Sequence, residues 1–100
     1  MSIRVIIPAT VGLQIDKIDA WWREHREAAP RLFSEELASA LELLSGAPHA
    51  GKVYRHPDVR SVRRLVLRAT RYHVYYRVAA SEVTVLSVWS AVRGSGPDLR

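Results

Sequence analysis

Apolar residues recur at two different spacings along the chain, and the spacing changes near residue 51. Before that point they recur every three or four residues over 11–22 and 33–44, which predicts two amphipathic helices. After it, apolar and polar residues alternate over 62–68, 72–78 and 83–89, which predicts three strands. The links between these strands are short enough only for hairpins, so we expect an antiparallel meander.

Prolines, glycines and capping residues predict where the helices begin and end. Residues 3–7 are expected to form a short strand that closes at Pro8, with Thr10 capping the first helix. Pro30 should end that helix and occupy the first turn of the second, which should stop at Gly46. The prediction is one α+β domain over 1–100. An N-terminal strand and a helical hairpin pack on a three- or four-stranded antiparallel sheet, and a mobile tail begins at about residue 94.

The net charge of +5 is unevenly distributed between the two halves of the chain. Residues 1–50 hold five basic and seven acidic side chains, a balance of −2, and residues 51–100 hold ten and three, a balance of +7. Thirteen of the fifteen basic residues are arginine, whose planar guanidinium suits phosphate and carboxylate groups. The C-terminal half therefore favours an anionic partner over a merely solvated face.

Strand alternation gathers polar residues on the sheet face opposite the helices. We expect this face to carry five candidate binding residues: Arg64, Arg68, His73, Tyr75 and Arg77. Arginines interleaved with aromatic residues are typical of nucleic-acid or acidic-peptide surfaces, whereas an ordinary half-solvated sheet is the alternative. Trp21 and Trp22 are both expected to anchor the core, because they continue the apolar stripe of the first helix.

Several kinds of chemistry have no support in the sequence. The chain has no cysteine, and its histidines lack the spacing of a metal site, so we expect no metal and no cofactor. There is no glycine-rich phosphate loop and no nucleophile elbow. No apolar stretch approaches a membrane span, and residues 1–16 do not resemble a signal peptide, so a cytoplasmic location is expected.

Three segments together resemble the ParE/RelE superfamily of toxins from bacterial type II toxin–antitoxin modules, which serve plasmid or chromosome maintenance. They are WWREHREAAPRLFSEEL, RRLVLRATRYHVYYRV and VTVLSVWSAVRG followed by SGPDL, and the likeness spans about residues 3 to 99. It is closer to the ParE-like branch. The resemblance implies a neighbouring antitoxin as partner, in a possible hetero-oligomer. It also implies one of two targets: DNA gyrase for ParE-like members, or ribosome-bound mRNA for RelE-like endonucleases.

The resemblance can be compared residue by residue with the endonuclease branch. That branch has two basic residues where this chain has Arg64 and Val66, an arginine at His73, and an arginine matching Arg93. Where some members place a catalytic histidine, this chain has Ser90, and it stops before a C-terminal helix.

We therefore interpret Arg64, His73 and Arg93 as catalytic candidates only if the chain is a nuclease. Otherwise these residues serve binding, together with the other polar-face residues. The prediction is a toxin that inhibits growth by binding DNA gyrase and that its antitoxin neutralises. The alternatives are an altered RelE-type endonuclease and a non-toxic relic that only binds an antitoxin.

Overall fold

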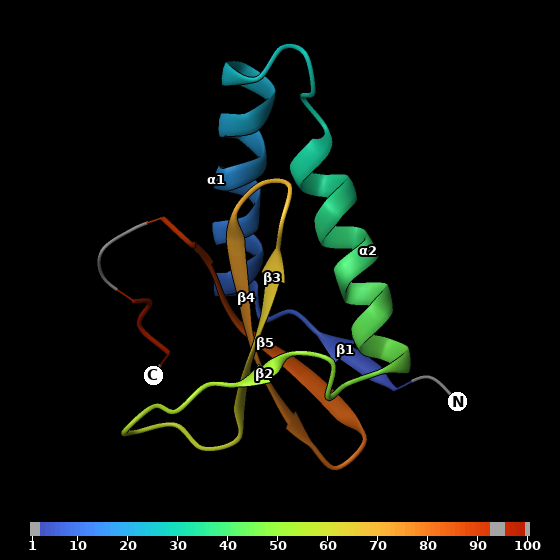
Figure 1. Cartoon of the computed structure of the whole chain (residues 1–100), viewed down its shortest axis with the longest axis vertical. Helices are drawn as coiled ribbons and strands as arrows, with labels where there is room; N and C mark the ends of the chain where they lie inside the picture. Colours follow the sequence, from blue (N-terminus) through green and yellow to red (C-terminus); the bar gives the residue numbers. More distant parts are fainter. Residues whose placement is uncertain (1–2, 93–95, 100) are drawn as a thin grey trace.

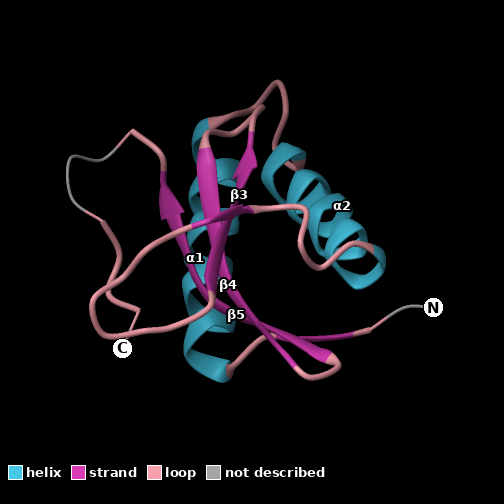
Figure 2. Cartoon of the chain, turned by 60° about the horizontal axis from the view of Figure 1, so that its bottom comes forward, coloured by secondary structure: helices cyan, strands magenta, loops and turns pink. Residues whose placement is uncertain are grey.

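The structure is a computed structural model of the 100-residue chain, and it describes residues 3–92 and 96–99. A helical hairpin, α1 (Ala9–His25) and α2 (Leu32–Gly46), covers one face of a five-stranded sheet (Figures 1 and 2). The strands are β1 (Arg4–Ile6), β2 (Lys52–Val53), β3 (Val62–Leu67), β4 (Tyr72–Ala79) and β5 (Glu82–Ser90). They lie in the order β1-β5-β4-β3-β2, which confirms the predicted α+β class.

The sheet is mixed, not purely antiparallel as the sequence predicted. β3, β4 and β5 form the expected antiparallel meander, and β2 adds to the outer side of β3. β1 instead pairs in parallel with the start of β5, with Val5 opposite Val83. The chain leaves β1 through both helices before it reaches the meander, and such a long connection permits a parallel pair.

The helices are shorter than the prolines suggested. α1 begins directly after Pro8, with no side-chain cap, so Thr10 lies inside the helix and not at its cap. It ends at His25, and α2 begins at Leu32, so Pro30 belongs to the connecting turn and not to the first turn of α2. Gly46 ends α2 as predicted. Neither α1 nor α2 combines the length and apolar character of a membrane-spanning helix.

The main core lies between the hairpin and the sheet. Its buried residues recur at helical spacing on α2, as the pattern predicted, and the strands supply the others: Phe33, Leu37, Ala40, Leu67, Val74, Val85 and Val88. Val85 and Val88 of β5 are three residues apart and not two, because the register between β4 and β5 shifts at this point. Trp22 joins this core, but Trp21 is 41% exposed, so the prediction of two core tryptophans is wrong for Trp21. Neighbours on a helix differ by about 100° in direction. Trp21 therefore points away from the core and contacts His25 at the end of α1 and Arg26, which directly follows it.

A second apolar cluster covers part of the opposite sheet face, which the sequence predicted to be polar. Val62, Tyr75 and Leu99 are buried there, with Tyr54, Val59, Leu86 and Trp89 packed against them. The loop before β3 and the C-terminal residues 96–99 supply the covering side chains. Mobility of the tail stays a prediction, and within the described residues Pro97 and Leu99 are buried.

Candidate functional site

The outer face of the sheet, opposite the helices, carries all five described candidate residues. Arg64 lies on β3, Arg68 directly follows it, and His73, Tyr75 and Arg77 alternate along β4. Cross-strand pairing sets Arg64 opposite Tyr75, while Arg77 faces Val62. Arg93, the remaining candidate, lies outside the described residues.

Exposure separates these five residues into two kinds. Arg68 and Arg77 are exposed, and each can reach a partner without rearrangement of the protein. Arg64 and His73 are half-buried, and Tyr75 is only 3% exposed beneath the outer apolar cluster. Tyr75 is therefore a structural support for the face and not a recognition side chain that a partner can contact directly.

Arg64 is the centre of the outer face. Its guanidinium carbon lies 5.4 Å from the centre of the Tyr54 ring, and Arg64 stands opposite Tyr75 in the strand register. Tyr54 and Tyr75 meet edge to face, with ring centres 4.9 Å apart. These contacts hold the guanidinium in a defined position, which lowers the entropy cost of binding an anion.

A basic cavity of about 230 Å³ opens beside Arg64. Lys52 of β2, Arg64 and Arg68 supply its cationic side chains, with Gly51 and Val66 among its other lining residues. Lys52 lies opposite Arg64 in the strand register. Sequence reasoning missed Lys52, because the two-residue strand β2 gives no alternation and only its pairing with β3 brings the lysine here. Three cations around one cavity favour a carboxylate or phosphate group.

His73 and Tyr75 form the pair of titratable groups on this face. The Tyr75 hydroxyl oxygen lies 3.5 Å from Nδ1 of His73. Burial, and secondly the charge of Arg64, lower the pKa of His73 below its ordinary 6.5. Burial raises the pKa of Tyr75, although the neighbouring Arg64 opposes that rise. Near neutral pH, His73 is therefore uncharged and Tyr75 is a protonated phenol.

The positions that differ from the endonuclease pattern can now be placed. Val66 lies directly across from His73 on β3, so an apolar side chain stands next to the imidazole where a second cation was expected. Ser90, at the end of β5, accepts a hydrogen bond from the main chain of Val92 at 3.3 Å. Within residues 3–92 and 96–99, no three histidine, aspartate or glutamate side chains come together to hold a metal ion.

Comparison with known families identifies the chain. Residues 6–93 match the model of the ParE toxin of the type II toxin–antitoxin system parDE. The chain belongs to the ParE toxin family. The match spans both helices and all five strands except the first residues of β1, so the resemblance inferred from three sequence segments is confirmed.

Solved structures share the fold of this ParE-family chain at low sequence identity. The chromosomal ParDE toxin–antitoxin system from P. aeruginosa superposes with a TM-score of 0.70 at 18% identity, covering 89% of this chain and 96% of that one. A mutant of the E. coli toxin RelE in the free state superposes with a TM-score of 0.60 at 20% identity, covering 92% and 86%. None of the curated proteins matches significantly.

Proposed function

We propose that this ParE-family toxin inhibits growth by binding DNA gyrase and that a cognate antitoxin neutralises it in a hetero-oligomer, in the cytoplasm. Family membership supports the toxin assignment. The outer face, with exposed Arg68 and Arg77 on either side of the positioned Arg64, supports an anionic contact surface. Two or three charge-assisted contacts of about 1.5–3 kcal/mol each are enough to make such a surface a major part of a binding site.

The observation that carries this proposal is the burial of Tyr75. Cleavage of RNA needs one group to accept the 2′-hydroxyl proton and another to protonate the leaving oxygen. On the described outer face His73 can accept a proton, but the phenol beside it is 3% exposed and has a raised pKa. The face therefore presents cations and one half-buried imidazole, an arrangement that suits binding better than proton transfer.

One observation favours the alternative of a ribosome-dependent mRNA endonuclease. The lowered pKa of His73 makes it an uncharged base at neutral pH, and the nearby Arg64 could stabilise phosphate charge. This alternative requires that the tail and loop over Tyr75 rearrange, so that its hydroxyl reaches the leaving oxygen.

Inhibition of DNA supercoiling by purified gyrase tests the binding proposal. The double variant Arg68→Glu/Arg77→Glu should inhibit at least roughly tenfold less well than the natural chain, because each lost charge-assisted contact costs about 1.5–3 kcal/mol. Arg31→Glu is the control, since Arg31 is exposed at the start of α2 and away from the outer face. Equal inhibition by both variants would place the gyrase contact elsewhere, and no inhibition by the natural chain would refute gyrase as the target.

A further inference from the structure

The segment from the end of α2 to the turn after β3, residues 47–70, concentrates positive charge. It contains six lysine or arginine residues and one aspartate, a balance of +5 that equals the net charge of the whole chain. Three of these cations, Lys52, Arg64 and Arg68, line the basic cavity beside β2 and β3, and no carboxylate is among its described lining residues. The cavity therefore favours an anionic ligand.

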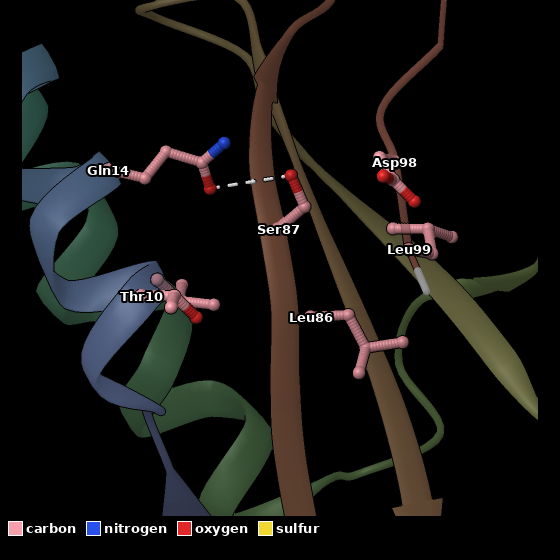
Figure 3. Close-up of a pocket in the computed structure, with 7 residues that line it drawn as sticks. Thr10, Gln14, Leu86, Ser87, Asp98 and Leu99 are labelled. Atoms are coloured by element: carbon pink, nitrogen blue, oxygen red, sulfur yellow. Dashed lines mark hydrogen bonds between the residues drawn. The ribbon is translucent and has the colours of Figure 1, made fainter.

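A cavity between α1, β5 and the C-terminal residues 96–99 differs from the basic cavity in charge. Its volume is about 310 Å³, and at its wall the Ser87 hydroxyl donates to Oε1 of Gln14 over 3.3 Å (Figure 3). Asp98 also lines this cavity, and none of its described lining residues is lysine or arginine. An anion is disfavoured there, so a cavity in this fold does not by itself imply an anion site.

A main-chain N–H of β3 adds a donor to the basic cavity. The Tyr54 amide donates to the Val62 carbonyl at 2.9 Å, so the main-chain groups of Val62 face the β2 side. Main-chain direction alternates along a strand, so Val66 presents its N–H and C=O on that same side. β2 begins at Lys52, opposite Arg64, so no described strand covers the main chain of Val66, which also lines the cavity.

The free stretch of this edge is too short for an added strand. β2 covers the edge up to Arg64 and β3 ends at Leu67, so within β3 only Val66 offers both main-chain groups to a partner. One N–H and one C=O make at most two hydrogen bonds, whereas strand addition uses a row of them. A compact phosphate group, with several acceptor oxygens, suits one amide and three clustered cations better than an extended acidic peptide does.

Further cations lie beyond the cavity, near the other end of β3. Arg77 of β4 stands opposite Val62, and it is exposed. Arg55, also exposed, directly follows Tyr54, whose amide bonds to Val62. Val62 and Arg68 are six residues apart in the chain, which corresponds to about 20 Å of extended strand. A row of cations this long can meet several phosphates, because they follow one another at about 3.4 Å along each strand of a DNA duplex.

The two tyrosine rings beside Arg64 are not free to stack on nucleic-acid bases. Arg64 lies over the Tyr54 ring, and Tyr75 is only 3% exposed. Proteins that hold single strands stack successive bases on accessible aromatic rings. Cations without such rings contact the phosphate backbone instead, and these contacts carry no sequence information. The arrangement therefore favours a duplex over a single strand.

We propose that the basic cavity binds a backbone phosphate of duplex DNA without sequence preference, with the Val66 amide as one donor and with Arg55 and Arg77 on further phosphates. The protein binds this DNA by itself. The inference rests on the proposed function only for its setting, in which gyrase presents the DNA.

The affinity for a fluorescent DNA duplex, measured by polarisation at several salt concentrations and without gyrase, tests the proposal. Lys52→Gln and Arg68→Gln each remove one cation from the cavity. Lys17→Gln on α1 and Arg31→Gln before α2 are the matched controls, since they remove the same charges from exposed positions outside the cavity. The competitors are the single strand of the same sequence, polyglutamate and inorganic phosphate.

Each cavity variant should bind the duplex roughly tenfold more weakly than the natural chain. Each should also lower the slope of log affinity against log salt by about 0.9, the value for one lost phosphate contact. The control variants should change the slope by less than half as much. The single strand and polyglutamate should compete less well than unlabelled duplex at equal charge. In NMR spectra the Val66 amide should shift when duplex is added, whereas the amides of Leu65 and Leu67, which face β4, should not.

Three results would overturn the proposal. They are equal losses from the cavity and control variants, tighter binding of the single strand or of polyglutamate than of the duplex, and a Val66 amide signal that stays in place. Binding of inorganic phosphate with no binding of DNA would overturn it as well. Gyrase inhibition without DNA binding would refute this inference alone, and DNA binding without gyrase inhibition would refute the proposed function alone.

Discussion

The burial of individual residues depends on tertiary packing as well as on the local sequence pattern. Trp21 and Trp22 are adjacent and chemically identical, yet Trp22 is 9% exposed and Trp21 41%. The apolar stripe of α1 correctly predicted that Trp22 is buried. It could not predict how much of the helix surface α2 and β5 cover, and Trp21 lies beyond the covered part. Tyr75 shows the reverse case. Alternation correctly placed it on the outer face, but only distant residues such as Leu99 bury it there.

Gly51 is predicted to be intolerant of even a methyl group. A Cβ atom there would lie 2.7 Å from the Tyr76 hydroxyl oxygen and 2.9 Å from the main-chain oxygen of Arg64. Tyr76 is fully buried and accepts a hydrogen bond from the Gly51 amide, so neither neighbour can move cheaply. Gly51→Ala should lower the free energy of unfolding by about 1–3 kcal/mol in urea denaturation.

Gly12→Ala is the matched control for that substitution. A Cβ atom at Gly12 meets nothing within 4 Å, and the residue lies inside α1. The alanine should therefore stabilise the protein by up to about 1 kcal/mol, because glycine is the poorer helix former. If both alanines destabilised the protein equally, the loss of stability at Gly51 would not be due to the close contacts around that residue.

His73 predicts a pH dependence of stability. Its pKa is lowered in the folded state, first by burial and then by Arg64, so between its folded value and 6.5 the unfolded chain binds more protons. The stabilisation from neutral His73 is therefore complete above about pH 6.5 and is lost as the pH falls through that window. Urea denaturation at successive pH values should show this loss, and His73→Gln should reduce it.

Arg64→Met provides a second check on the same residue. Removing the guanidinium should raise the pKa of His73 towards its ordinary value, which an NMR titration of the imidazole measures directly. A His73 pKa above 6.5 in the natural chain would contradict this description of the outer face.

At the scale of elements, a carboxylate joins the hairpin to the meander. Glu36 of α2 accepts hydrogen bonds from the amides of Ala69 and Thr70, at 2.7 and 2.9 Å, and from the Thr70 hydroxyl at 2.6 Å. These three bonds hold the turn between β3 and β4 against α2, where Thr70 is 6% exposed. The sequence offered no signal for this contact, because Glu36 and Thr70 are 34 residues apart and each is ordinary in its own segment.

Glu36→Ala should therefore destabilise the fold far more than the removal of an ordinary surface charge would. Two main-chain donors and a buried hydroxyl would lose their acceptor, which should cost about 2–4 kcal/mol in the free energy of unfolding. Glu24→Ala, at an exposed position on α1, is the comparison. Its free energy of unfolding should stay within about 0.5 kcal/mol of that of the natural chain. Similar melting curves for the two variants would show that the turn does not depend on Glu36.

The elements themselves were predictable to different degrees, for physical reasons. The hairpin and the three-stranded meander follow from local periodicity, because each buries one regular face. The parallel pairing of β1 and the position of β2 depend on residues far away in the chain, and three- and two-residue strands are too short to show alternation. The bulge between Tyr75 and Tyr76 shifts the register of β5 and likewise leaves no clear sequence signal.

At the scale of the whole molecule, the sequence correctly predicted which sheet face is basic. It did not predict the residues that cover part of that face. Charge asymmetry and strand alternation assembled Arg64, Arg68, His73 and Arg77 on one surface, whereas Lys52 and the apolar cover over Tyr75 emerged only from the fold. The resulting surface combines exposed cations with a phenol that is removed from solvent. We therefore propose that the whole molecule binds a target and does not cut RNA.

One side-by-side assay tests that preference most directly. The purified natural chain and His73→Ala are each added to gyrase with supercoiled plasmid, and to ribosomes programmed with an mRNA whose ends are mapped. Both proteins should trap cleaved DNA on gyrase within a few-fold of each other, and both should leave the mRNA intact. Site-specific mRNA cleavage by the natural chain that falls by about 10²–10⁴-fold in His73→Ala, with no effect on gyrase, would contradict the proposal and establish the endonuclease.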